Sequence, residues 1–239
     1  MGGVAEGRGG FGEKDMITLG IECSSRQGSV ALLKDGELLA EKSWIAERVR
    51  HNTIFQTLEN LMEEVHMSYN DISLYAVGRG PGSFSGMRMS FAIAQALALP
   101  IKTEVRTVSS GAALALAVAR EGAEQIAVVG DARRGQVWIG FFQTLEKNGE
   151  VFPTIGMVSY PEREALKSDA VGWKLAPYEE VDVPEGTIVV SPEAERLTEI
   201  FPNIGKPAFP HAKEVVELAL MQTDPEPLEP LYMHPPVFI

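Results

Sequence analysis

The chain has 239 residues, of which 45% are hydrophobic and 23% are charged. This composition is typical of a folded globular protein and excludes a collagen-like, low-complexity or wholly disordered chain. The 21 Lys and Arg residues and 33 Asp and Glu residues give a formal net charge of −12, which disfavours unaided binding to nucleic acid or to an anionic membrane. With a single cysteine, Cys23, the chain can form neither an internal disulfide nor a cysteine-rich zinc site.

Residues 1–15 are rich in glycine and lack the apolar segment of a signal peptide. They predict a flexible tail before Met16, which could itself be the start. The longest apolar stretches, 92–101 and 112–119, are shorter than the roughly 20 residues that span a bilayer, so no membrane span is predicted. The unpaired cysteine fits a reducing compartment, and we expect a cytoplasmic protein.

The first half of the chain alternates between strand-like and helix-like patterns. Residues 16–22, 29–33 and 37–43 are predicted strands, joined by a polar turn and then by the hairpin signal Asp35-Gly36. A helix at 51–65, a strand at 74–78, a glycine-rich loop, a helix at 87–99 and a strand at 101–105 follow. This order is that of the ribonuclease H-like fold, so residues 16–106 form a predicted first lobe.

The second half is also a mixture of strands and helices. It predicts helices at 109–120, after Pro161, after Pro192 and at 212–221, and strands at 125–129, 136–143, 150–158 and 187–190. The tail from Asp224 is rich in proline and is expected to lie extended over the surface. Two mixed halves of similar size predict a duplicated α/β fold, with residues 107–239 as the second lobe.

The loop GPGSFSGMR, at 80–88, joins a predicted strand to a predicted helix. Backbone N–H groups at the start of a helix can hold an anion. The same glycines would also permit a tight turn and close packing of the helix on the sheet, with Ser83 as the N-cap. Because the spacing matches neither a Walker loop nor a dinucleotide fingerprint, both interpretations stay open on these residues alone.

This loop closely resembles the GPGSFTGLR signature of the TsaB family, also called YeaZ, which takes part in making the threonylcarbamoyl modification of tRNA adenosine. GIECSS at 20–25 stands where the family has a strand ending in Asp-Thr-Ser, and His51 opens the first helix. DARRGQVW at 131–138 is similar to the family's second hairpin, and EPLY at 229–232 to its tail. Order and spacing agree from about Met16 to Tyr232.

The resemblance implies the two-lobed fold of the actin, hexokinase and Hsp70 ATPases, built of two ribonuclease H-like lobes with mixed sheets and flanking helices. It implies a non-catalytic partner subunit that binds TsaD and supports threonylcarbamoylation of tRNA adenosine 37. It further implies a larger assembly with TsaE, a possible homodimer of the isolated chain, and contact with tRNA only through the complex. The family has also been labelled a glycoprotease.

In the family, two helices pair with TsaD, and here they correspond to the predicted helices that follow His51 and Ser85. The second is apolar nearly all round, so more than its own sheet must cover it. The resemblance therefore assigns partner binding to seven apolar side chains, Ile54, Phe55, Leu58, Met62, Met87, Met89 and Phe91. That these residues form internal core is the alternative.

The resemblance also places a degenerate nucleotide or anion site at Ser24, Ser25, Gly80, Gly82, Ser83, Gly86, Asp131 and Arg133. An ATPase of this fold needs glycine beside its first-strand carboxylate so that phosphates can approach the backbone. Here Glu22 is followed by Cys23 and Ser24. Asp131 and Arg133 could instead form a hairpin salt bridge of modest value. We expect no cofactor, with at most weak binding of ATP or ADP.

The sequence predicts no catalytic residue and no metal site. The four histidines, His51, His66, His211 and His234, include no pair at the close helical spacing of metal ligands. Neither an HExxH motif nor a Gly-x-Ser-x-Gly elbow is present, which disfavours a protease, and Cys23 is expected in the core. The alternatives are an independent metal- or ATP-dependent hydrolase of the same fold and a stable homodimer with a diverged role.

Overall fold

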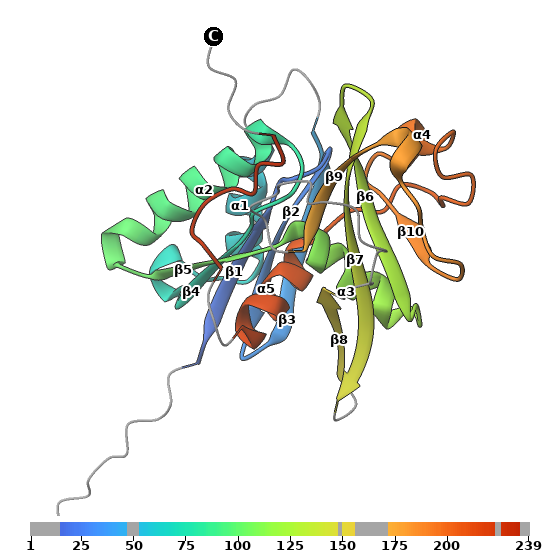
Figure 1. Cartoon of the computed structure of the whole chain (residues 1–239). Coiled ribbons are helices and arrows are strands. Elements are labelled where there is room, and N and C mark those ends of the chain that lie inside the picture. The colour runs from blue at the N-terminus through green and yellow to red at the C-terminus, as the bar shows by residue number, and fades with distance from the viewer. Residues whose placement is uncertain (1–14, 47–52, 148–149, 156–171, 223–225, 235–239) are drawn as a thin grey trace, which may run out of the picture.

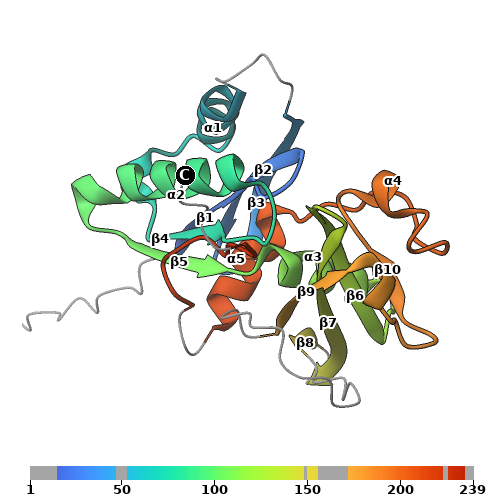
Figure 2. The ribbon, with the colours of Figure 1, turned by 45° about the horizontal axis from the view of Figure 1, so that its top comes forward.

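A computed structural model of the chain describes residues 15–46, 53–147, 150–155, 172–222 and 226–234 (Figure 1). The helix predicted after Pro161, residues 156–158 of a predicted strand, and His51 lie outside these ranges. The described residues form two mixed α/β lobes that lie side by side, as Figures 1 and 2 show from two directions. This confirms the predicted fold class.

The first lobe is built on a five-stranded sheet with the order β3-β2-β1-β4-β5. Its strands are β1 (Ile17–Glu22), β2 (Gln27–Lys34), β3 (Glu37–Ile45), β4 (Leu74–Gly78) and β5 (Glu104–Val108). The first three are antiparallel, whereas β1, β4 and β5 run parallel. The predicted strand at 101–105 begins later, because residues Leu99–Ile101 form a 3₁₀ turn after the preceding helix. A second such turn, Tyr69–Asp71, precedes β4.

Helices cover both faces of this sheet, and the alternation of side chains along each strand decides which face they meet. On one face, Val30 and Leu32 pack in the same cluster as residues of α1 (Thr53–Glu64) and α2 (Phe84–Ala98). On the other face, Ala31 and Leu33 pack against α5 (Ala212–Met221). The first lobe is therefore a three-layer sandwich with its core on both sides of β1.

The second lobe is built on a sheet with the order β10-β6-β7-β8, and β9 also pairs with β7. Its strands are β6 (Gln125–Arg133), β7 (Gln136–Lys147), β8 (Glu150–Ile155), β9 (Trp173–Pro177) and β10 (Ile188–Val190). Helix α3 (Ser110–Arg120) packs on one face. The other face is covered by α4 (Ala194–Leu197), the residues that follow it and the segment around the 3₁₀ turn Tyr178–Glu180.

Strand β9 is an element that sequence patterning does not predict, because its sequence WKLAP has no regular alternation and ends in proline. Its Trp173 is buried, and the ring lies over Gly111 of α3 and Gly140 of β7, where a side chain would collide with it. Burial of this indole and the pairing of β9 with β7 therefore hold β9 in place.

The two lobes share their central helices. Helix α5 comes from the C-terminal half of the chain, yet it packs against β1, β2 and β4 of the first sheet and also contacts α3. Gly20 permits this approach, since a Cβ there would lie 2.6 Å from the carbonyl oxygen of Ala212. The boundary predicted near Arg106 falls within β5, and the first sheet depends on a helix well beyond it.

The described part of the C-terminal tail, Glu226–His234, is called the strap below. It is extended, as predicted, and the buried guanidinium of Arg79 anchors it. Arg79 Nε donates to the carbonyl of Glu229 at 3.0 Å, its Nη1 lies 3.2 Å from the Glu226 carboxylate, and the Leu231 N–H donates back to the Arg79 carbonyl at 2.7 Å. These bonds fix the strap beside the glycine loop that follows β4.

Candidate functional site

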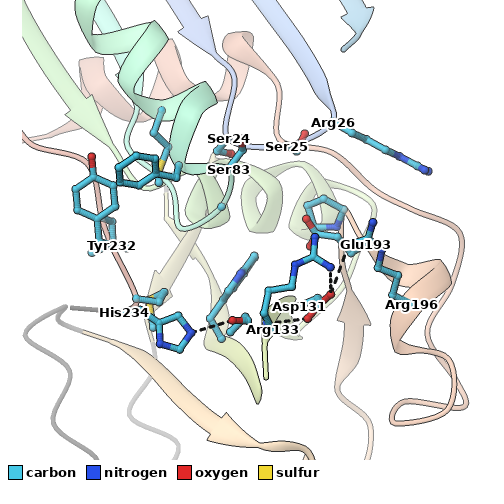
Figure 3. A pocket seen from close by; sticks show the side chains of 18 of the residues that line it. Ser24, Ser25, Arg26, Ser83, Asp131, Arg133, Glu193, Arg196, Tyr232 and His234 are labelled. Atoms are coloured by element: carbon cyan, nitrogen blue, oxygen red, sulfur yellow. Dashed lines mark hydrogen bonds and ion pairs between the residues drawn. The ribbon is translucent and has the colours of Figure 1, made fainter. Parts of the chain in front are cut away.

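A cavity of about 660 Å³ lies between the lobes (Figure 3). Six segments that are distant in the sequence line it: the turn after β1, Ala46 after β3, the glycine loop, the β6–β7 hairpin, the segment around α4 and the strap. The cavity brings together six of the eight residues predicted for a degenerate anion site, namely Ser24, Ser25, Gly82, Ser83, Asp131 and Arg133. Gly80 and Gly86 are not among its lining residues.

The glycine loop is shaped for close packing against the turn after β1. A Cβ on Gly82 would lie 2.1 Å from the Ser24 carbonyl oxygen, and one on Gly86 would lie 1.9 Å from the Cys23 carbonyl oxygen. Gly82 and Gly86 therefore let the start of α2 approach the first-lobe backbone more closely than any other residue would permit. Cys23 itself is buried, which confirms the core role, and burial raises the pKa of its thiol to about 12.

The polar groups of the glycine loop are largely satisfied within the protein. The Gly80 N–H donates to Ser110 Oγ at 3.0 Å, the Ser83 N–H to the Ser24 carbonyl at 2.6 Å, and the Gly86 N–H to Ser83 Oγ at 3.3 Å. Ser83 is thus the predicted N-cap of α2. The N–H groups of Gly80 and Gly86 are thus already bonded to serine hydroxyls, and neither glycine lines the cavity, so their place in an anion site stays a prediction.

The carboxylate at the end of β1 is buried and does not line the cavity. Glu22 Oε1 accepts the Ser24 N–H at 2.5 Å, and Oε2 accepts the hydroxyl of Ser110, the first residue of α3, at 2.6 Å. Burial raises the pKa of Glu22, and the hydrogen bonds from Ser110 and Ser24 only partly oppose this. Glu22 therefore ties β1 to α3 and offers nothing to a ligand between the lobes.

The β6–β7 hairpin carries charged groups into the cavity. Arg133 and Arg134 both have left-handed backbone conformations, with φ of 68° and 56°. Asp131 Oδ2 lies 2.8 Å from Arg133 Nη1 and 3.5 Å from Arg196 Nη1. The hairpin salt bridge weighed from the sequence is therefore present, and it extends to Arg196 of α4.

Three lining features were not predicted as part of a site. The first is Glu193, whose pKa is raised by burial and further by the nearby Asp131. The second is an ion pair between Arg26 of the first lobe and Glu195 of the second, with distances of 3.1 and 3.2 Å. The third is the strap, and the EPLY resemblance in the tail was the one sequence signal that pointed to any of them.

The strap reaches the second lobe at the far side of the cavity. His234 Nε2 donates to the Ala132 carbonyl at 2.8 Å, and the ring of Tyr232 lies 5.0 Å from that of Phe84 at the start of α2. The guanidinium of Arg88 lies over the same Phe84 ring, at 5.2 Å. The strap thus contacts both lobes and forms part of the cavity wall.

The predicted partner surface on α1 and α2 is narrower than expected. Five of its seven side chains, Ile54, Leu58, Met62, Met87 and Phe91, are buried in the chain's own core. For these five, the core alternative holds, because α1 and α2 use them to cover the first sheet. Phe55 and Met89 remain exposed, by 52% and 36%, and are available to a partner.

Further apolar side chains extend this surface along α2 and the turn after it. Phe84, Leu99 and Ile101 are exposed, by 57%, 77% and 40%. The described stretch 84–101 is long and apolar enough to suit a membrane span by composition alone, although the sequence analysis predicted none. In the fold, however, α2 lies on β4, β1 and β5. A helix that packs on a sheet and also carries apolar groups on its outer side has the same length and apolar composition as a membrane-spanning helix.

The chain is similar to a protein family and to several known proteins. A family model described as "TsaD: tRNA N6-adenosine threonylcarbamoyltransferase" matches residues 44–219. The TsaB "tRNA threonylcarbamoyladenosine biosynthesis protein" of Bacillus subtilis is 32% identical over 134 residues, which cover 56% of this chain and 57% of that protein. The protein of the same name from Escherichia coli is 33% identical over 135 residues, covering 56% and 58%. The matches span little more than half the length of these relatives.

A crystal structure from Pseudomonas aeruginosa, of an uncharacterized protein with similarity to peptidase YeaZ, has a TM-score of 0.73 and 25% identity. It covers 92% of this chain and 100% of that one. The two mixed sheets and the cavity between the lobes define a two-lobed α/β protein of the actin-like ATPase fold class. The chain belongs to the TsaD family of the matching model and, within it, to the TsaB, or YeaZ, group.

Proposed function

We propose that the chain is an accessory subunit that binds TsaD and supports the threonylcarbamoylation of adenosine 37 in tRNA. One observation carries this proposal: a member of the TsaB group exposes Phe55 on α1 and Met89, Leu99 and Ile101 on and beside α2. These two helices cover one face of the first sheet (Figure 2). Exposed apolar groups gathered on neighbouring elements are typical of a protein interface.

Several features support an accessory role rather than catalysis by this chain. Glu22 is buried beneath the cavity, and the N–H groups of Gly80, Ser83 and Gly86 are bonded internally. Among the described residues, no three His, Cys, Asp or Glu side chains gather as metal ligands would. We therefore infer that the transfer chemistry belongs to the partner, and that this chain binds ATP or ADP weakly if at all.

The finer assembly follows from the same proposal. A chain of net charge −12 would contact tRNA only through the complex, since its own field repels phosphates. We place the assembly in the cytoplasm, with TsaE as a further component. In the absence of TsaD, the apolar groups on α1 and α2 would pair with a second copy of the chain, giving a homodimer.

The test is complex formation with TsaD from the same organism, followed by size-exclusion chromatography with light scattering. Phe55→Asp and Met89→Asp change exposed side chains, so both variants should keep the wild-type melting temperature. Ile188→Asp is the matched control, because Ile188 is 47% exposed on β10 of the second lobe, away from α1 and α2.

We expect a heterodimer with the wild type and with Ile188→Asp, and a loss of association of tenfold or more, about 1.4 kcal/mol, for Phe55→Asp or Met89→Asp. A folded wild-type chain that stays free of TsaD at concentrations of tens of micromolar, or a complex that neither variant weakens, would contradict the proposal.

A further inference from the structure

The cavity between the lobes has two chemically different ends. Tyr232 stands at one end, and Asp131 and Glu193 stand at the other, where the β6–β7 hairpin meets the start of α4 (Figure 3). Near Tyr232 the lining is apolar and aromatic, with Phe84, Met87, Leu231 and Met233. A ligand that fills the cavity must therefore combine a flat apolar part with a polar part.

The polar end is poorly suited to phosphate groups, because the arginines that line it are already paired with carboxylates. Arg26 forms two bonds to Glu195, at 3.1 and 3.2 Å, and Arg133 lies 2.8 Å from Asp131. Arg196 shares the same Asp131 oxygen at 3.5 Å. A nucleoside triphosphate would have to break these pairs and would then face the released carboxylates.

Glu193 adds an acceptor that the protein does not satisfy. Its Oε2 is buried, and no hydrogen-bond partner for this atom is present among the described residues. A buried acceptor without a donor is costly, and it is the kind of group that a ligand's O–H or N–H would relieve. Asp131 beside it is already satisfied, because its Oδ1 accepts the Arg133 N–H and the Tyr178 hydroxyl and its Oδ2 pairs with Arg133 and Arg196. Glu193 Oε2 is therefore the buried acceptor that a ligand could satisfy at this end of the cavity.

The aromatic end offers a ring for stacking. Tyr232 is 43% exposed, and its one ring contact within the described part of the chain is with Phe84. The strap holds Tyr232 in this position through its neighbours, because Leu231 is bonded to Arg79 and His234 to Ala132. A flat heterocycle could stack on Tyr232 without displacing any of these contacts.

We propose that this cavity binds a nucleoside in preference to a nucleotide, with the base stacked on Tyr232 and a ribose hydroxyl donating to Glu193. A carboxylate is a common partner of ribose hydroxyls in nucleoside sites. The volume of about 660 Å³ lies within the usual range for small-molecule sites. The proposal goes beyond the accessory role and does not depend on TsaD binding.

The experiment is isothermal titration of the full chain with adenosine, AMP and ATP at low salt. We expect saturable binding of adenosine, with affinity falling by about tenfold or more from adenosine to ATP, since each added phosphate meets carboxylates rather than free arginines. Equal or tighter binding of ATP, reduced by Arg133→Ala, would overturn the proposal and assign a phosphate site instead.

Matched variants test each end of the cavity. Tyr232→Ala should weaken adenosine binding by about fivefold or more, whereas Tyr232→Phe should leave it unchanged. Glu193→Gln should weaken it by about fivefold, and Glu199→Gln, an exposed change outside the cavity lining, should not. Melting temperatures of all variants establish that they are folded.

Adenosine that shows no saturable binding to the folded wild type at millimolar concentration would also overturn the proposal. Phe55→Asp separates the two functions, because Phe55 does not line the cavity. The Phe55→Asp variant should lose binding to TsaD and keep binding to adenosine. A failure of the proposed accessory role can therefore be told apart from a failure of the proposed nucleoside site.

Discussion

The turn after β1 and the turn between β6 and β7 face one another across the cavity, and each follows a buried strand. In the first, the Glu22 carboxylate is fully enclosed and bonded to Ser24 and Ser110. In the second, Asp131 pairs with Arg133, whose side chain is 67% exposed. Equivalent positions in two similar lobes thus have different uses. The first turn holds the fold together, and the second presents charge to whatever enters the cavity.

The largest expected effect on stability comes from a substitution in the turn after β1. Glu22→Ala would leave the Ser24 N–H and the Ser110 hydroxyl without their acceptor and would open a cavity, so it should lower the free energy of unfolding by about 3 kcal/mol or more. Chemical denaturation measures this. Glu22→Gln, which keeps the volume and one acceptor, should cost clearly less. If the two variants were equally destabilised, the hydrogen bonds would not be the cause.

The next largest effect on stability is expected where the start of α2 approaches the turn after β1. In Gly86→Ala the new Cβ would lie 1.9 Å from the Cys23 carbonyl oxygen, a backbone atom that cannot move away alone. We expect a loss of about 2 kcal/mol in the free energy of unfolding, measured in the same way. Gly205→Ala is the control, since nothing lies within 4 Å of the added methyl. A Gly86→Ala protein as stable as the control would show that the helix can shift at no cost.

A substitution in the turn between β6 and β7 should change the free energy of unfolding much less. The Asp131 side chain is 9% exposed, but Asp131→Asn keeps the Oδ1 that accepts the Arg133 N–H and the Tyr178 hydroxyl. It removes a charge whose partners Arg133 and Arg196 are both more than half exposed, so the free energy of unfolding should change by less than about 1 kcal/mol. Thermal unfolding at low and at high salt checks this, because screening should reduce even that small difference. If Asp131→Asn lowered the free energy of unfolding as much as Glu22→Ala, the two turns would not differ in their contribution to stability.

The smallest effect concerns His211, which lies 3.3 Å from Gln27 next to the first turn. A hydrogen bond to Glu41 raises the pKa of His211 above its ordinary value of 6.5, with smaller contributions from Glu214 and Glu22. Because the folded protein holds this proton more tightly, the stabilisation is complete below pH 6.5 and is lost as pH rises through the folded-state pKa.

Melting temperatures between pH 6 and 9 should therefore fall more steeply with pH for the wild type than for His211→Gln. Parallel curves for the two proteins would show that the pair with Glu41 does not form in solution. The effect is expected to be shallow, since His211 is partly exposed and solvent screens the pair.

Much of the first lobe could be predicted from the sequence, because its elements carry local signals. The hairpin at Asp35-Gly36, the periodic apolar residues of α1 and the Ser83 cap all appear where the patterns indicate. The second lobe was less predictable. Strand β9 is held by burial of Trp173 and by pairing with β7, and these long-range contacts leave no periodicity in its own five residues.

The sequence predicts only part of the candidate site, because some of its residues carry a local motif and others meet only in the fold. The hairpin residues Asp131 and Arg133 belong to a recognisable motif, and the cavity contains them. Glu193, Arg196 and Tyr232 come from segments that become neighbours only in the fold, and only Tyr232, in the EPLY stretch, has a local sequence signal. Periodicity also could not separate Phe55 from Ile54, since both are apolar and only the orientation of α1 decides which one is exposed.

The position of α5 has a consequence for the order in which the protein can fold during synthesis. All five strands of the first sheet have been made once Val108 is in place, yet the helix that covers their second face begins at Ala212. Until then, the nascent chain must carry Ala31, Leu33 and Val108 on an uncovered sheet face while the whole second lobe is translated. Helix α5 therefore decides when the first lobe becomes stable, and its removal should impair the half of the molecule made first.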